Sequence, residues 1–318
     1  MACNNKILSF LKKVIHNSIK DSLKFASIDI GSNAMRLLFC RVIEDNTATT
    51  YIKESLIRMP LRLGQDAFTI GAISEDNSKK LIDTIHAFYL MIKAYDPISF
   101  RSCATAALRT ASNGKTIVDL INSKVEVDLE IISGEEEARI IMANHIDQHL
   151  DQQKNYIYID VGGGSTEISF IFNRQKVSSK SFPIGSVRLL ENQVTDDDWQ
   201  EMKRWILKNK ANFKGNVKGI GSGGNINKIF SMSQLQKNSE IDISTIQNVL
   251  SDISPLSIQK RITELGLRPD RADVILHAGK IYESIMRWSQ CKEMIVPQSG
   301  LPDGIIHELY DSYINTKI

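Results

Sequence analysis

The sequence predicts an α/β protein made of two domains of one architecture that flank a cleft. Segments 25–33 and 156–166 each read as a strand that ends in an Asp-x-Gly turn, and a second apolar strand follows each turn. The two aspartates, Asp29 and Asp160, lie 131 positions apart (160 − 29), a spacing too long for a solenoid repeat. The chain length of 318 residues also suits two domains better than one.

Between and after the two turns, helical and extended patterns alternate. Ser74 is expected to cap a helix over 74–94, because two acids and an apolar stripe follow it. Other segments expected to be helical are 106 onward, 135–148 and 269–288, and those expected to be strands are 98–104, 129–132 and 294–296. A glycine-rich loop at 218–224 follows a short strand and opens a further helix.

Composition excludes several classes of protein. Charged residues make up 24% of the chain and the net charge is only +2, so no overall basic field indicates a nucleic-acid partner. The four cysteines are far apart, which fits reduced thiols of a cytoplasmic protein better than a disulfide framework or zinc site. No apolar run is long enough for stable membrane insertion. Residues 1–24 form a basic extension that could bind a membrane surface or partner, although a loosely attached helix is favoured.

Both Asp-x-Gly turns are suited to binding phosphate. A glycine turn after a strand directs backbone amides to one point, and glycine permits close approach and positive φ. Asp29 and Asp160 would repel a phosphate unless a divalent ion such as Mg²⁺ lay between carboxylate and phosphate. Hairpin turns without a ligand are the alternative, but two turns in matching context favour phosphate binding. The residues expected to bind phosphate here are Gly31, Ser32, Asn33, Gly162, Gly163, Gly164, Ser165 and Thr166.

Two other patterns are weaker. Gly219-x-Gly221-x-x-Gly224 matches a dinucleotide fingerprint, but the acid expected about 20 residues later is missing. A third ligand loop formed by Gly221, Ser222, Gly223 and Gly224, or a plain strand-to-helix turn, explains it equally well. His145 and His149 have zinc-like spacing, but a solvated helix face is the better interpretation.

An acidic helix start and an arginine complete the set of candidates. Glu135, Glu136 and Glu137 begin a helix, where acids are favoured electrostatically. Consecutive helical positions point in different directions, so one of the three can face a cleft as a general base, and spacing alone does not say which. Arg109, just inside another helix, could bind phosphate oxygens or simply lie at the surface.

Taken together, these motifs resemble the exopolyphosphatase and guanosine pentaphosphate phosphohydrolase family. The matching segments follow the family's order from about residue 25 to the C-terminus. They are 28–33, 62–64, 104–109, 133–139, 159–167, 182–188, 221–224, 271–279 and 300–304.

The resemblance implies two ribonuclease-H-like domains, as in actin-like ATPases, on either side of the cleft. It implies that Asp29 and Asp160 hold Mg²⁺ or Mn²⁺, that Glu137 is the catalytic base and that Arg109 binds phosphate. The third loop and the helix from residue 271 resemble the element that receives adenosine in related ATPases. A homodimer is possible by resemblance alone.

We expect a basic extension over 1–24, one domain over 25–135, a second over 136–300, and a C-terminal helix over 301–318 that packs back on the first domain. Long family members carry an additional helical domain after this point, so the chain resembles a short, two-domain member, and processive degradation of long chains is in doubt. The activity expected is release of terminal orthophosphate from polyphosphate. The alternatives are 5′-phosphohydrolysis of guanosine pentaphosphate and a non-catalytic nucleotide or polyphosphate sensor.

Overall fold

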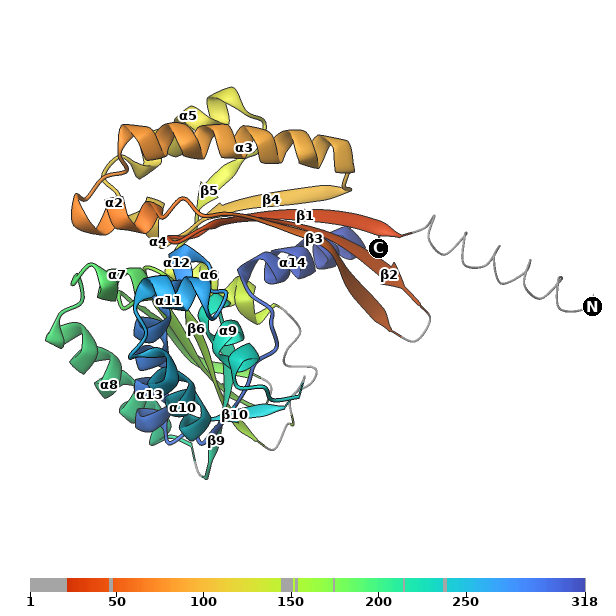
Figure 1. Ribbon diagram of the computed structural model, residues 1–318. Helices are drawn as coiled ribbons and strands as arrows, with labels where there is room; N and C mark the ends of the chain where they lie inside the picture. The colour runs from red at the N-terminus through yellow and green to blue at the C-terminus, as the bar shows by residue number, and fades with distance from the viewer. Residues whose placement is uncertain are drawn as a thin grey trace, which may run out of the picture.

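The computed structural model describes residues 22–45, 48–143, 151, 154–173, 175–213, 215–236 and 239–317. Two β-sheets form its framework, one in each half of the chain (Figure 1). The strands of the first sheet are β1 Leu23–Ile30, β2 Met35–Glu44, β3 Thr49–Met59, β4 Ser99–Ala104 and β5 Leu129–Ile131. The strands of the second are β6 Asn155–Val161, β7 Thr166–Phe172, β8 Gln175–Phe182, β9 Val217–Ser222, β10 Glu240–Asp242 and β11 Glu293–Ile295.

The two sheets repeat one topology. Their strand orders are β3-β2-β1-β4-β5 and β8-β7-β6-β9-β11-β10, so β10 is the only strand of the second sheet without a counterpart in the first. β1 pairs antiparallel with β2 and parallel with β4, just as β6 pairs antiparallel with β7 and parallel with β9. This repetition confirms the predicted pair of ribonuclease-H-like α/β domains.

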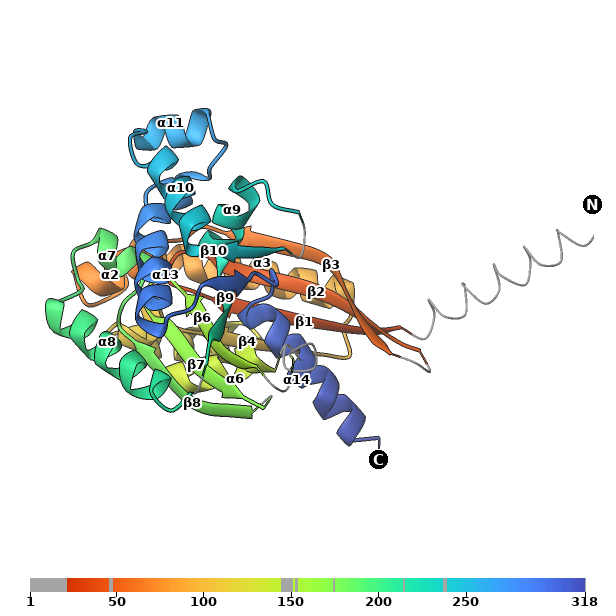
Figure 2. The ribbon, with the colours of Figure 1, turned by 90° about the horizontal axis from the view of Figure 1, so that it is seen from below.

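Helices cover the sheets, and some of them lie between the two halves (Figures 1 and 2). In the first half they are α2 Leu63–Thr69, α3 Glu75–Tyr95, α4 Ala106–Thr110 and α5 Gly114–Lys124. In the second half they are α6 Gly134–Met142, α7 Ser186–Leu190, α8 Asp196–Lys210, α9 Gly224–Met232, α10 Ile243–Ile253, α11 Ile258–Thr263, α12 Pro269–Ala272, α13 Ile275–Ser289 and α14 Leu301–Asn315. α3 begins as the sequence predicts, because the Ser74 hydroxyl accepts a hydrogen bond from the Asn77 amide.

The single helix predicted over 269–288 is wrong, because the structure divides it into α12 and α13. At the break, the Asp273 carboxylate pairs with Arg62 of the other half of the chain. The next residue, Val274, is fully buried in the core of the first domain. Contacts across the domain boundary therefore override the local helical pattern. In the helix predicted over 135–148, α6 is observed to Met142, and His145 and His149 lie outside the described residues, as do residues 1–21.

α14 crosses back to the first domain. It contacts β1, β2 and β4 of the first sheet and α6 of the second half. A buried cluster with members from both halves, including Cys103, Ile140, Tyr158 and Ile305, joins the two halves of the chain. The two sheets that carry the hairpins therefore share apolar contacts.

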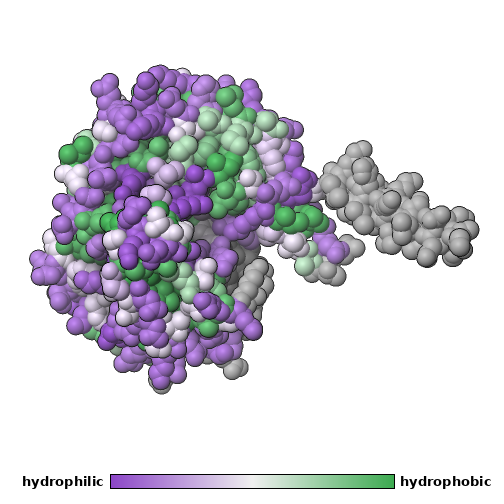
Figure 3. Space-filling view, in the orientation of Figure 1, coloured by the Kyte–Doolittle hydropathy of each residue, from purple (hydrophilic) through white to green (hydrophobic). Residues whose placement is uncertain are grey.

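The outer surface carries mixed side chains. Hydrophilic residues cover most of the face in Figure 3, with smaller apolar groups between them. In the described part of the chain, no helix combines the length and the apolar character needed to cross a bilayer.

Candidate active site

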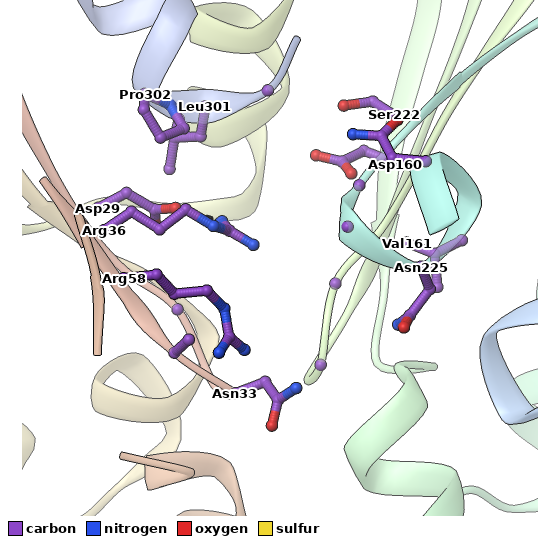
Figure 4. A pocket seen from close by; sticks show the side chains of 18 of the residues that line it. Asp29, Asn33, Arg36, Arg58, Asp160, Val161, Ser222, Asn225, Leu301 and Pro302 are labelled. Carbon is purple, nitrogen blue, oxygen red and sulfur yellow. Dashed lines mark hydrogen bonds and ion pairs between the residues drawn. The ribbon is translucent and has the colours of Figure 1, made fainter. Parts of the chain in front are cut away.

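A cleft of about 650 Å³ opens between the two sheets. Asp29, Arg36 and Arg58 reach into it from the first sheet, and Asp160 and Ser222 reach into it from the second (Figure 4). The aspartates of the two repeated turns therefore face one cavity from opposite sides.

The two Asp-x-Gly turns have the same internal geometry. In the first, the Gly31 amide donates to the carbonyl of Ala34 at 3.1 Å. In the second, the Gly162 amide donates to the carbonyl of Ser165 at 2.9 Å. Each turn follows the central strand of its sheet, so the duplication detected in the sequence is a duplication of geometry.

The glycines of the second turn allow the two turns to touch. A Cβ on Gly163 would lie 3.0 Å from the Cβ of Ser32, and one on Gly164 would lie 2.7 Å from the hydroxyl of Ser32. The predicted positive φ is wrong for these turns, because the positive-φ glycines among the described residues are Gly71, Gly215, Gly223 and Gly266. Close approach between the domains is therefore what these glycines provide.

Asp29 is paired with an arginine that the sequence interpretation did not single out. Arg36 lies directly opposite Asp29 on β2, and its Nη1 is 2.6 Å from Oδ2 of Asp29. The Asp29 side chain is only 3% exposed. Burial raises the pKa of Asp29, and the neighbouring guanidinium opposes this rise.

Asp160 lies among other acids. Glu167 is directly opposite it on β7 and is itself buried. Burial, followed by repulsion from Glu167, raises the pKa of Asp160 to about 7. Burial, again followed by repulsion from Glu167, raises the pKa of Glu137 well above its ordinary value. The second domain thus contributes three mutually repelling carboxyl groups with raised proton affinity.

The three glutamates at the start of α6 point in different directions, as consecutive helical positions must. Glu135 is exposed, Glu136 forms ion pairs with Arg101 and Arg139, and Glu137 lines the cleft. The Ser133 hydroxyl caps the helix by accepting from the Glu136 amide at 3.0 Å. Glu137 is therefore the member of this set that can reach a bound substrate.

Arg109 lies beside Glu137 and outside the lining of the cleft. Its Nη1 donates to the carbonyl of Ile132 at 2.8 Å and is 3.4 Å from Oε2 of Glu137. Its observed contact is with the candidate base, and phosphate binding by Arg109 remains a prediction.

The third glycine loop reaches the cleft with its last three residues. Gly223 has a φ of 113° and precedes α9, and a Cβ there would lie 2.9 Å from the carbonyl of Val161. Gly221 lies within β9, where Met294 packs against it. The dinucleotide fingerprint is therefore accidental, since two of its glycines serve strand packing.

Arg271 projects toward the start of α9. A Cβ on Gly224 would lie 2.9 Å from Nη2 of Arg271 and 3.8 Å from Nη2 of Arg36. The Arg271 side chain has no hydrogen-bond or ion-pair partner among the described residues. Burial, then repulsion from Arg58 and Arg268, lowers the pKa of Arg271 to about 10. Positive charge from Arg58, Arg268 and Arg271 gathers here, and Asp270 offsets only part of it, as expected at an anion-binding site.

Most of the predicted site residues meet in this cleft. Those that line it are Asp29, Gly31, Ser32, Asn33, Glu137, Asp160, Gly162, Gly163, Gly164, Ser165, Ser222, Gly223 and Gly224. Arg109, Thr166 and Gly221 do not line it, and the Thr166 hydroxyl donates to the buried carbonyl of Ile184 at 2.5 Å. The residues that sequence reasoning did not assign to the site include Arg36, Lys53, Glu167, Lys228, Arg268 and Asp303.

The register of the two hairpins could have revealed two of these residues. Arg36 follows Asp29 by seven positions (36 − 29), and Glu167 follows Asp160 by the same number (167 − 160). In a tight antiparallel hairpin, that spacing places the second residue beside the first.

Polar contacts also join the domains at the mouth of the cleft. Nη2 of Arg62 is 2.6 Å from Oδ2 of Asp273, and Arg58 pairs with Asp270. The Asn33 side-chain amide donates to the carbonyl of Asp270 at 2.7 Å. We refer to Asn33, Arg58, Arg62, Asp270 and Asp273 as the domain seam.

Comparison with known proteins agrees with this geometry. The profile of the Ppx/GppA phosphatase family matches residues 52–313. This chain belongs to that family. Membership identifies it as an enzyme that hydrolyses phosphoanhydride bonds.

Curated relatives include Exopolyphosphatase 1 of Mycobacterium tuberculosis, which is 23% identical over 91% of this chain and 89% of its own length. The bifunctional 3-dehydroquinate synthase/phosphatase of Fusobacterium nucleatum is 27% identical over 92% of this chain. This chain spans only 48% of that protein.

Solved structures share the fold. An exopolyphosphatase from Cytophaga hutchinsonii has a TM-score of 0.78 at 20% identity and covers 91% of this chain and 98% of its own. The Ppx/GppA family member of Aquifex aeolicus has a TM-score of 0.72 at 21% identity and covers 92% of this chain and 99% of its own.

Proposed function

We propose that this family member is an exopolyphosphatase that releases the terminal orthophosphate of linear polyphosphate. The observation that carries the proposal is the charge of the cleft. Its lining includes Arg36, Lys53, Arg58, Lys228, Arg268 and Arg271, and among the described residues it includes no aromatic side chain. A polyanion needs many cations along its length, whereas a guanine base is commonly held by stacking on an aromatic ring.

The reacting end of the substrate would lie at the two turns. Turn amides and the Ser32 and Ser165 hydroxyls would hold the terminal phosphoryl group, and Glu137 would take a proton from the attacking water. The raised pKa of Glu137 suits a base that works near neutral pH. Arg109 would hold the Glu137 carboxylate in place, and Arg271 would bind the rest of the chain.

Asp29 and Asp160 fit a small divalent cation, because they are carboxylates that face one cleft from matching turns. Mg²⁺ or Mn²⁺ bound to them would neutralise phosphate charge. The protein's own groups supply the positioning and the proton transfer.

One observation favours guanosine pentaphosphate as a second candidate substrate. Asn225 and Asn227 line the cleft on α9 just after Gly224, which Arg271 approaches. Side-chain amides can recognise the hydrogen-bonding edge of a base.

A phosphate-release panel tests the proposal. Purified full-length chain with Mg²⁺ or Mn²⁺ would be given tripolyphosphate, long-chain polyphosphate and guanosine pentaphosphate. We expect kcat/KM to be highest for a polyphosphate. A higher value for guanosine pentaphosphate would favour the second substrate, and tight polyphosphate binding without phosphate release would favour a sensor.

A further inference from the structure

Arg36 places a positive charge among three carboxylates. Its guanidinium contacts Asp29 at 2.6 Å and interacts electrostatically with Asp160 and Asp303. The Arg36 side chain is 33% exposed, so it can reach solvent in the cleft, whereas Asp29 is almost fully enclosed. Figure 4 shows Arg36 extending from the first sheet into the cavity that Asp160 enters from the other side.

This is also the location of the proposed cation. Among the described residues, no group of three or more His, Cys, Asp or Glu side chains is arranged to hold a metal. A Mg²⁺ or Mn²⁺ ion would therefore rely on Asp29 and Asp160 together with water and phosphate oxygens, as Mg²⁺ commonly does. Oδ2 of Asp29 already accepts from Arg36. Two cations on one enclosed carboxylate would repel each other strongly, because little water screens them.

We propose that Arg36 is an internal competitor of the divalent cation for Asp29. Metal binding requires the guanidinium to leave Asp29, and metal loss lets it return as a counter-ion. The inference rests on the part of the proposed function that makes Asp29 a metal ligand, but it does not depend on which substrate is hydrolysed.

Mn²⁺ titration followed by electron paramagnetic resonance tests this without substrate. The metal-free full chain would be compared with Arg36→Met, Arg36→Lys and Arg58→Met. We expect Arg36→Met to bind Mn²⁺ about tenfold tighter, because a neighbouring arginine lowers the proton affinity of a carboxylate by about tenfold or more and should oppose a metal cation in the same way. Arg36→Lys should show a smaller gain, since the charge remains on a shorter donor.

Arg58→Met is the matched control. It removes the same charge from the same cleft, but Arg58 pairs with Asp270 and not with Asp29. Its effect on Mn²⁺ affinity should be smaller than that of Arg36→Met. Adding Asp29→Asn to Arg36→Met should abolish the gain.

Several outcomes would overturn the inference. They are equal or weaker Mn²⁺ binding by Arg36→Met, an equal gain in Arg58→Met, and absence of Mn²⁺ binding in every variant. If Arg36→Met does not fold, as judged by circular dichroism, Arg36→Lys decides by the same criterion. A wild type that hydrolyses no phosphoanhydride while Arg36→Met binds Mn²⁺ more tightly would reject the proposed function and leave this inference standing.

Discussion

The two hairpins share a backbone and differ in charge. β1–β2 and β6–β7 present an aspartate at the same position of the same glycine turn. Opposite Asp29 stands Arg36, which forms an ion pair with it, and opposite Asp160 stands Glu167, which repels it. A single reversal of charge at equivalent positions gives one half of the cleft its own counter-ion and leaves the other half with an excess of acid.

The difference divides the chemistry between the domains. The acid-rich hairpin is next to Glu137, whose proton affinity is raised by burial and by Glu167. The neutralised hairpin is close to Arg271, whose guanidinium, like that of Arg36, lies near Gly224. Under the proposed mechanism, proton transfer would belong to the acid-rich side of the cleft, and both turns together with Arg271 would hold the anion.

The largest effect is expected at the acid-rich side. Glu137→Gln keeps the size of the side chain but removes the base, and we expect kcat to fall by about 10²–10⁴. Phosphate release under substrate saturation measures it, with Glu135→Gln as a matched control because Glu135 is exposed outside the cleft. An unchanged kcat in Glu137→Gln would remove Glu137 from the mechanism.

Neutralising each aspartate in turn tests whether the two hairpins have different roles. We expect Asp160→Asn to lower kcat/KM by about 10²-fold and Asp29→Asn by about tenfold, since Arg36 beside Asp29 can still neutralise phosphate charge when Asp29 is lost. Steady-state kinetics at saturating Mg²⁺ make the comparison. Asp119→Asn, an exposed acid on α5, serves as the control. Equal losses, or the reverse order, would show that the pairing of Asp29 with Arg36 has no functional weight.

The stability of the metal-free protein should depend on pH through Asp160. Its pKa is about 7 in the folded state and lower when unfolded, so between those values the folded protein binds a proton that the unfolded chain does not. The free energy of unfolding therefore falls as pH rises from about 4 to about 7, by up to about 1.4 kcal/mol per unit for this group.

Urea unfolding at about pH 5 and about pH 7 tests this dependence. Asp160→Asn should flatten it, and Glu167→Gln should flatten it partly, because Glu167 is the second cause of the shift. A slope that both variants leave unchanged would mean that the acid-rich hairpin does not set the pH dependence.

Local patterns predicted the repeated part of this structure well. The spacing of the Asp-x-Gly turns predicted two sheets of one topology, and the cap at Ser74 predicted the start of α3. Spacing alone could not tell which of the three acids of α6 faces the cleft, because that depends on where α6 packs. Family resemblance selected Glu137, which is the member that lines the cleft.

What local patterns missed depends on contacts between the domains. The break between α12 and α13 follows from Asp273 and Val274 engaging the other domain. The resemblance placed the helix from residue 271 at the ligand, but the crowding of Arg271 with Arg58 and Arg268 appears only in three dimensions. Local propensity carries no information about such pairings, since their partners lie far away in the sequence.

The smallest effect is expected at the Arg62–Asp273 pair of the domain seam, which does not line the cleft. Arg62 and Asp273 form a partly buried pair with side-chain exposures of 27% and 13%. A double-mutant cycle with Arg62→Met and Asp273→Asn should give a coupling of about 1 kcal/mol in the free energy of unfolding. The single variants should raise KM by a few-fold and leave kcat nearly unchanged, because this pair joins the two domains beside the cleft and does not contact the reacting groups. A loss of kcat as large as that of Glu137→Gln would mean that the two hairpins depend on the domain seam for their alignment. The seam would then share in catalysis with both hairpins.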